Sequence, residues 1–112
     1  MKKVIKASEL HSYTVIVNFA GYMGADEDYH VIEADEDDAI YAALEQARDD
    51  LSIEDIEEID EGEYEVHVGF CGYIGVEEVY TVIADSEDEA SEGAIDYAYN
   101  DLSAEISYSE ED

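Results

Sequence analysis

Carboxylates are the chemical groups that this sequence supplies in greatest number. Of its 112 residues, 33 are Asp or Glu and only four are Lys or Arg. Carboxylates can act as general acids and bases, can ligate hard cations such as Ca²⁺, or can present fixed negative charge to a cationic partner. These three uses require different spacings and neighbours, so the placement of the acidic residues decides among them.

Metal binding finds little support in the spacing. An EF-hand loop needs alternating ligands and a Gly at its sixth position, and the dense acidic runs 26–28 and 35–38 lack that Gly. The three histidines are scattered, and the single cysteine, Cys71, cannot form a Cys-x-x-Cys pair. We therefore expect no cofactor and no specific metal site, only weak, non-specific attraction of divalent cations.

Catalysis is also disfavoured. So many acidic residues are present that counting cannot single out a glycosidase pair, and a small chain built largely of a repeat leaves little room for a pocket of about 300–1,000 Å³. Cys71 aligns with Ala20 in the repeat described below and lacks a basic neighbour that would activate it. The Gly-Tyr-x-Gly motif at 21–24 and 72–75 lacks the Lys of a phosphate loop. We predict that the protein is not an enzyme.

The remaining use of the carboxylates is to present negative charge to a partner. Some of them occupy positions that lower the stability of the predicted helices. Acidic residues in the first turns of the predicted helices favourably oppose the helix dipole. In contrast, like charges four residues apart cost about 0.2–0.5 kcal/mol per pair, and Asp49, Asp50 and Asp101 fall at predicted helix C-termini, where anions are unfavourable. Because no structural gain is evident, we predict that the helical rows bind a partner: Glu45, Asp49, Asp88, Glu92 and Asp96.

A second predicted binding segment is the most acidic stretch of the chain, residues 54–63. Its predicted contact residues are Glu54, Asp55, Glu57, Glu58, Asp60 and Glu61.

These side chains must be positioned by a tandem repeat. Residues 13–54 match residues 64–105 at 20 of 42 positions without a gap, at an offset of 51. In each copy, the pattern Tyr-x-Val-x-Val-x-Phe is typical of a half-buried strand, and the Gly-Tyr-x-Gly motif that follows predicts a hairpin to a second strand near 27–33 or 78–84.

A helix follows the hairpin in each copy. Asp35 and Ser86 occupy equivalent N-cap positions, and Ser86 with Glu89 forms a capping box. Two apolar stripes at helical spacing predict the buried faces: Ala39, Ile40, Ala43, Leu44, Ala47 and Leu51 in the first copy, and Ala90, Ala94, Ile95, Ala98 and Leu102 in the second.

The expected fold class is therefore α+β, a tandem β-β-α repeat that forms one four-stranded antiparallel sheet with two helices on one face. We expect a single domain over residues 1–112, with an acidic connector at 55–63 between the repeats and a short edge strand at 104–108.

The net charge of −29 sets the class of partner. Duplex DNA carries one charge per roughly 1.7 Å, so 29 charges correspond to about 49 Å of duplex, whereas a compact chain of this length should be about 34 Å across. We expect a protein at least as negative per unit length as DNA, which repels nucleic acid and attracts proteins that grip it.

The remaining composition favours a folded protein in a reducing, cytoplasmic compartment. Hydrophobic residues make up 46% of the chain, which is too apolar for an obligately disordered protein. A lone cysteine cannot form an internal disulfide, no apolar run approaches 18 residues, and the basic start lacks the apolar run of a signal peptide.

In charge, size and lack of catalytic signatures, residues 7–112 resemble the DNA-mimic inhibitors of phages and mobile elements, the anti-restriction and anti-CRISPR proteins. The resemblance is compositional and transfers no residue roles. It implies a protein that occupies the positively charged nucleic-acid groove of a bacterial defence nuclease, a Cas9-type effector or a restriction enzyme, and blocks DNA binding.

Two alternatives stay open: an acidic adaptor of a basic host protein, and a small halophile-adapted domain of unrelated function. The sequence does not decide the target, the oligomeric state, or whether one or both repeats contact the partner.

Overall fold

The computed structural model describes residues 10–110 and shows an α+β protein. In chain order the elements are β1 (His11–Phe19), β2 (Asp26–Glu33), α1 (Glu36–Asp49), β3 (Leu51–Asp60), β4 (Glu63–Phe70), β5 (Glu77–Ile83), α2 (Glu87–Asn100) and β6 (Leu102–Glu110). The predicted hairpins, helices and N-caps are confirmed: the side chains of Asp35 and Ser86 accept hydrogen bonds from the backbone N–H groups of Asp38 and Glu89.

The expected single four-stranded sheet is wrong. The strands form two three-stranded antiparallel sheets, sheet A with the order β2-β1-β6 and sheet B with the order β3-β4-β5. The predicted connector at 55–63 is mostly strand: β3 runs to Asp60, a turn at Glu61 and Gly62 follows, and β4 begins at Glu63. The predicted edge strand at 104–108 is part of the longer β6.

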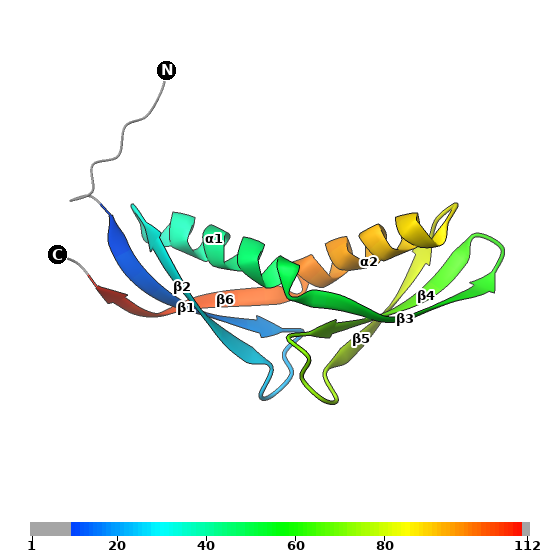
Figure 1. Ribbon diagram of the computed structural model, residues 1–112, viewed down its shortest axis with the longest axis horizontal. Helices are drawn as coiled ribbons and strands as arrows, with labels where there is room; N and C mark the ends of the chain where they lie inside the picture. The colour runs from blue at the N-terminus through cyan, green and yellow to red at the C-terminus, as the bar shows by residue number, and fades with distance from the viewer. Residues whose placement is uncertain (1–9, 111–112) are drawn as a thin grey trace, which may run out of the picture.

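The third strand of each sheet comes from the other repeat. β3 follows α1 but pairs with β4, whereas β6 follows α2 and pairs with β1. Helix α1 packs on β1, β2 and β6, and α2 packs on β3, β4 and β5 (Figure 1). Each repeat therefore completes the sheet of the other, and we call this arrangement the strand exchange.

Small residues on the helices let each helix approach its sheet closely. The buried helical residues are Ala39, Ala43 and Ala47 on α1 and Ala90, Ala94 and Ala98 on α2. They face the buried alternate residues of the central strands, which are Tyr13, Val15, Val17 and Phe19 on β1 and Tyr64, Val66, Val68 and Phe70 on β4. The period-2 and helical stripes thus meet in one apolar core, as their spacing predicts.

The two halves join through contacts that the 51-residue offset of the repeat relates to one another. The Phe19 and Phe70 rings lie 5.9 Å apart, centroid to centroid. The Ala20 N–H donates to the Asp101 carbonyl (2.9 Å), and the Cys71 N–H donates to the Asp50 carbonyl (3.0 Å). The repeat is therefore a pseudo-twofold symmetry of the structure as well as of the sequence.

The molecule is elongated. Its longest dimension is 55 Å and its radius of gyration is 16.9 Å, above the roughly 13 Å of a compact chain of this length. Spread over that length, the net charge amounts to one charge per about 1.9 Å, against about 1.7 Å in duplex DNA. The expectation that the protein is at least as negative per unit length as DNA is therefore slightly wrong, because side-by-side sheets lengthen the body.

Candidate functional site

A dense group of carboxylates lies on the face of sheet B that is turned away from α2. In β4, alternate residues from Tyr64 to Phe70 are buried, so the residues between them point outward. Residues paired directly across an antiparallel sheet share a face, and β3 brings Glu57 opposite Glu65 and Asp60 opposite Glu63. We call this surface the acidic sheet face, and it carries Glu54, Asp55, Glu57, Asp60, Glu63, Glu65 and Glu77.

Irregular pairing between β3 and β4 adds carboxylates to this face. The pairing register shifts between Ile53 and Asp55, so that Ile53 pairs with Val68 and Ile56 with Val66, and Glu54 and Asp55 are left outward. The Ser52 hydroxyl donates to Glu54 Oε1 (2.6 Å). A Cβ on Gly69 would lie 2.5 Å from the same oxygen, so the glycine gives the Glu54 side chain room to lie across the sheet.

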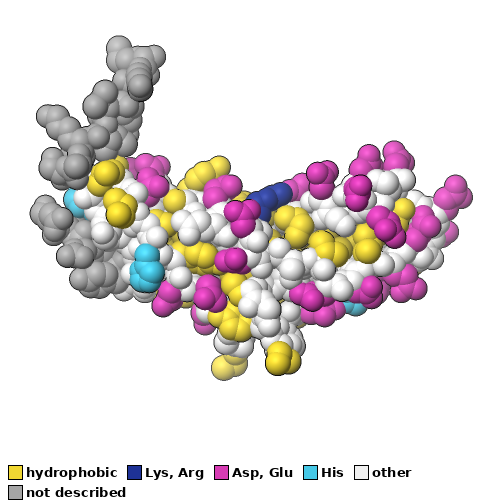
Figure 2. Space-filling view, in the orientation of Figure 1, with side chains coloured by type: hydrophobic (Ala, Val, Ile, Leu, Met, Phe, Trp, Pro, Cys, Tyr) yellow, Lys and Arg dark blue, Asp and Glu magenta, His cyan; other side chains and the backbone are white. Residues whose placement is uncertain are grey.

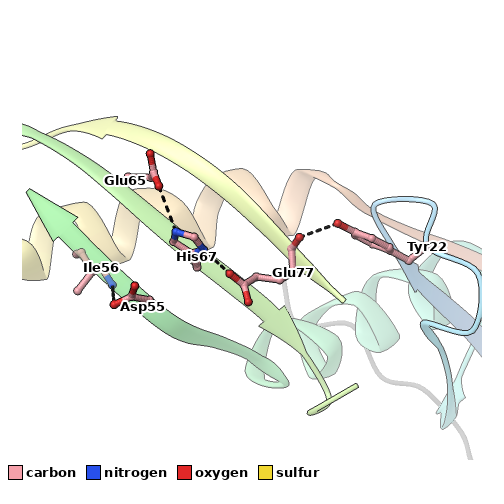
Figure 3. A network of polar contacts seen from close by, with 6 residues as sticks. All are labelled: Tyr22, Asp55, Ile56, Glu65, His67 and Glu77. Carbon is pink, nitrogen blue, oxygen red and sulfur yellow. Dashed lines mark hydrogen bonds and ion pairs between the residues drawn. The ribbon is translucent and has the colours of Figure 1, made fainter. Parts of the chain in front are cut away.

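His67 lies among these carboxylates (Figure 3). Its Nδ1 contacts the Glu77 carboxylate, its Nε2 lies 3.3 Å from Glu65 Oε1, and Asp55 is its partner on β3. Hydrogen bonding to Glu77 and then to Glu65 raises the pKa of His67, against the opposing effect of burial. The pairs Glu57/Glu65 and Asp60/Glu63 still place like charges opposite each other, which is unfavourable for sheet stability.

The matching face of sheet A is far less acidic. The outward positions of β4 are occupied in β1 by neutral residues: Ser12, Thr14, Ile16 and Asn18. Among residues 10–107, the acidic residues of that face are Asp26, Asp28 and Glu105. Since both sheets share one fold and one core pattern, folding does not require the carboxylates of the acidic sheet face. Figure 2 shows acidic side chains crowding the half of the molecule that contains α2 and sheet B.

The structure brings together four of the six residues predicted in the acidic segment, Glu54, Asp55, Glu57 and Asp60. Glu58 pairs with Tyr64 and so lies on the helix-bearing side of the sheet, where it helps to raise the pKa of that tyrosine, after burial. Glu61 lies in the turn between β3 and β4.

Sequence reasoning missed Glu63, Glu65 and Glu77. These residues alternate with core positions in β4 or begin β5, and the period-2 pattern could have placed the first two on the outer face.

The predicted helical rows divide into two groups. Asp49, Asp88 and Glu92 are exposed. Asp96 accepts a hydrogen bond from Arg48 (2.6 Å), and Glu45 accepts one from the Tyr99 hydroxyl (3.2 Å).

The Arg48 guanidinium also lies 5.2 Å from the centre of the Tyr99 ring. Glu45 and Asp96 therefore join the C-terminal ends of α1 and α2, a structural contact that was not evident from the sequence.

The anions after the helix C-termini also have partners. The Tyr29 hydroxyl donates to Asp50 Oδ2 and the Tyr80 hydroxyl to Asp101 Oδ2, both at 2.5 Å. Burial and then these hydrogen bonds raise the pKa of both tyrosines well above the ordinary range. The unfavourable position of each aspartate is thus offset by a phenol from the preceding hairpin, which the sequence alone did not reveal.

Among the described residues, there is little support for a metal site, a small-molecule pocket or a membrane span. Among residues 10–110, no three His, Cys, Asp or Glu side chains are arranged to hold a metal ion. A cleft of about 170 Å³ lies on sheet A, lined by Ile16, Asn18, Asp26, Ser103, Ala104 and Glu105. This volume is below the roughly 300–1,000 Å³ of typical ligand pockets. No helix in the described range is long and apolar enough to cross a membrane.

Comparisons with protein-family models, curated proteins and solved structures found no match to this chain. Its function has to be inferred from its own surface.

Proposed function

We propose that this protein binds the basic nucleic-acid groove of a DNA-binding protein, a bacterial defence nuclease in the first instance, and keeps DNA out of it. The observation that carries the proposal is the acidic sheet face, where seven carboxylates from three strands share one surface on which, of residues 10–110, His67 is the only basic side chain: Glu54, Asp55, Glu57, Asp60, Glu63, Glu65 and Glu77.

A sheet is a suitable support for such a display. Alternate residues on a strand lie about 6.8 Å apart and neighbouring strands about 4.8 Å apart, so the carboxylates form a fixed array. Arginine binds carboxylates and phosphates with the same bidentate geometry. Because backbone pairing already fixes the strands, only side-chain entropy is lost when a partner binds, which favours affinity.

The uneven distribution of charge argues against adaptation to molar salt. Such adaptation places acidic residues over the surface in general, whereas the outward side of β1 is neutral and the equivalent side of β4 carries Glu63 and Glu65. The divergence between two otherwise matching sheets favours selection for a contact on one of them.

The test is displacement of labelled duplex DNA from two probes, a guide-loaded Cas9-type effector and a restriction endonuclease, followed by fluorescence polarisation. The wild-type protein should release DNA from at least one probe, with an affinity that falls as salt rises. Asp55→Asn, Glu57→Gln and Asp60→Asn combined should weaken inhibition at least about tenfold, since about 1.4 kcal/mol is tenfold and the loss of even one hydrogen bond to a charged group costs about 1.5–3 kcal/mol.

The matched control removes the same number of charges from the helices, as Asp49→Asn, Asp88→Asn and Glu92→Gln combined. Equal losses in the two triple variants would mean that only the overall field acts and that the acidic sheet face is not the contact.

Displacement from neither probe, together with capture of a chromatin-like or ribosomal protein from lysate, would favour the adaptor function. Folding only near molar salt, followed by circular dichroism, would favour the halophile alternative.

A further inference from the structure

Two apolar side chains stand at the ends of the hairpin loops. Met23, in the loop between β1 and β2, is 99% exposed, and Ile74, in the loop between β4 and β5, is fully exposed. They occupy equivalent positions in the two repeats. Single exposed apolar residues are normal on protein surfaces, but full exposure at both copies of one position calls for a reason.

The two loops lie side by side and bind each other crosswise (Figure 1). The Tyr22 hydroxyl donates to the Glu77 carbonyl (2.6 Å), and the Tyr73 hydroxyl donates to the Asp26 carbonyl (2.8 Å). Tyr73 also donates to Glu27 Oε2 (2.6 Å). This hydrogen bond is the largest of the effects that raise the pKa of Tyr73 to about 12. These bonds fix the two tips relative to each other.

Each tip is also locally constrained. Met23 lies between Gly21 and Gly24, which have φ values of 76° and 84°, in the region that favours glycine. The Tyr22 and Tyr73 rings pack 6.4 Å from Phe19 and Phe70, centroid to centroid, and so tie both loops to the core. Since Met23 and Ile74 add almost nothing to that core, their apolar surface is available to another molecule.

We propose that Met23 and Ile74 are paired anchors that insert into apolar depressions beside the basic groove of the partner protein. This inference rests on the proposed function and extends its contact surface. Glu77 links the two parts, because its carbonyl accepts the Tyr22 bond while its carboxylate lies on the acidic sheet face. The anchors are therefore continuous with the charged surface.

Charge complementarity selects the occupant. The loops are followed by Asp26 and Glu27 in one repeat and by Glu77 and Glu78 in the other. An anionic lipid surface or a nucleic acid is repelled by these residues, whereas a cationic protein surface is attracted. Methionine is enriched at protein interfaces, and a few desolvated anchors surrounded by polar contacts carry most of the binding energy there.

The test compares two peptide probes with equal numbers of lysines, an oligolysine and an amphipathic helical peptide with a stripe of leucines. The wild type should bind the leucine-bearing peptide about tenfold more tightly, by burial of apolar side chains. Met23→Ser with Ile74→Ser should abolish that excess, leave binding to oligolysine unchanged, and keep the melting temperature, because both side chains are exposed.

Ile32→Ser with Tyr41→Ser is the control, since these two residues are 64% and 63% exposed and lie on β2 and α1, outside the acidic sheet face. This control should keep the excess affinity. The inference is overturned if the wild type binds both peptides equally, or if the excess survives in the Met23/Ile74 variant. Failure to bind oligolysine at all would instead count against the proposed function.

Discussion

His67 makes the charge of the acidic sheet face depend on pH. It lies in contact with Glu77 and Glu65 and can carry a positive charge among seven carboxylates. When His67 is protonated it partly neutralises its neighbours, and when it loses the proton the face becomes more negative. Attraction of a basic partner should therefore strengthen as pH rises through the pKa of this histidine.

The pKa of His67 is raised by its carboxylate partners. Its contribution to stability should be fully present below the unfolded pKa of about 6.5 and should be lost as pH rises through the higher folded pKa. Glu77→Gln removes the larger cause, so the midpoint of the His67 imidazole signals in an NMR titration should fall.

Asp26→Asn is the control for this titration, because Asp26 is the equivalent of Glu77 in the other repeat and lies in sheet A. It should leave the His67 midpoint in place. A midpoint that does not respond to Glu77→Gln would show that the Glu77 contact does not form in solution.

At the scale of elements, the junction between each helix and the next strand is held by a tyrosine. Asp50 follows α1, its carboxylate accepts the Tyr29 hydroxyl, and its carbonyl accepts the N–H of Cys71 in the other repeat. Asp101 has the same arrangement with Tyr80 and Ala20. Each aspartate thus fixes the point where the chain crosses from one sheet to the other.

Tyr29→Phe and Tyr80→Phe should each lower the free energy of unfolding by about 0.5–1.5 kcal/mol, since each removes one hydrogen bond to an exposed carboxylate. The loss should be larger for Tyr29, which is buried, than for Tyr80, which is only partly so. Urea denaturation measures it, with Tyr41→Phe on the exposed side of α1 as a control that should change little. If both hairpin variants match that control, the two hydroxyls do not stabilise the junctions.

Periodicity predicted the elements whose buried and exposed residues alternate regularly. The hairpins were predicted because buried residues such as Val15 and Val17 recur at every second position. The helices were predicted because the alanine stripes keep the helical period. β3 was missed as a strand because the bulge at Glu54 brings Ile53 and Ile56, three residues apart, to the same face, which breaks the period of two. Because β3 was missed and β6 was expected only as a short edge strand at 104–108, one four-stranded sheet was the simplest arrangement of the hairpin strands.

The candidate site was predictable only in part for the same reason. Acidic density pointed to Glu54, Asp55, Glu57 and Asp60, but their neighbours come from β4 and β5 and depend on strand register. Tertiary hydrogen bonds, such as that between Tyr99 and Glu45, leave no local pattern in the sequence.

For the molecule as a whole, the two halves share one strand order and one helix packing but differ in where the chain is joined. β3 and β4 are connected through Glu61 and Gly62, whereas the equivalent strands β6 and β1 pair side by side without a connection, with Glu110 opposite Ser12. The pseudo-twofold symmetry therefore predicts that the chain can be joined at either place.

A circular permutant that links Glu110 to His11 through a Glu-Gly turn and opens between Glu61 and Gly62 should fold as a monomer. Its unfolding free energy should stay within about 1–2 kcal/mol of the original, because exposed loop tips tolerate new termini. Size-exclusion chromatography and thermal denaturation test this.

The control permutant opens between Asp50 and Leu51 and should be much less stable, since it cuts the chain where it crosses between sheets beside a buried leucine. A stable control together with an unfolded first permutant would contradict the symmetry of the two joints.

The strand exchange also determines how the fold depends on protein concentration. One repeat alone would lack its third strand and would have to borrow it from a second chain, so its folding would obey mass action and fail on dilution. Covalent tethering supplies the missing strand at an effective concentration of the order of millimolar. A molecule built in this way stays assembled at any dilution, so the binding proposed above would not weaken through dissociation of the fold.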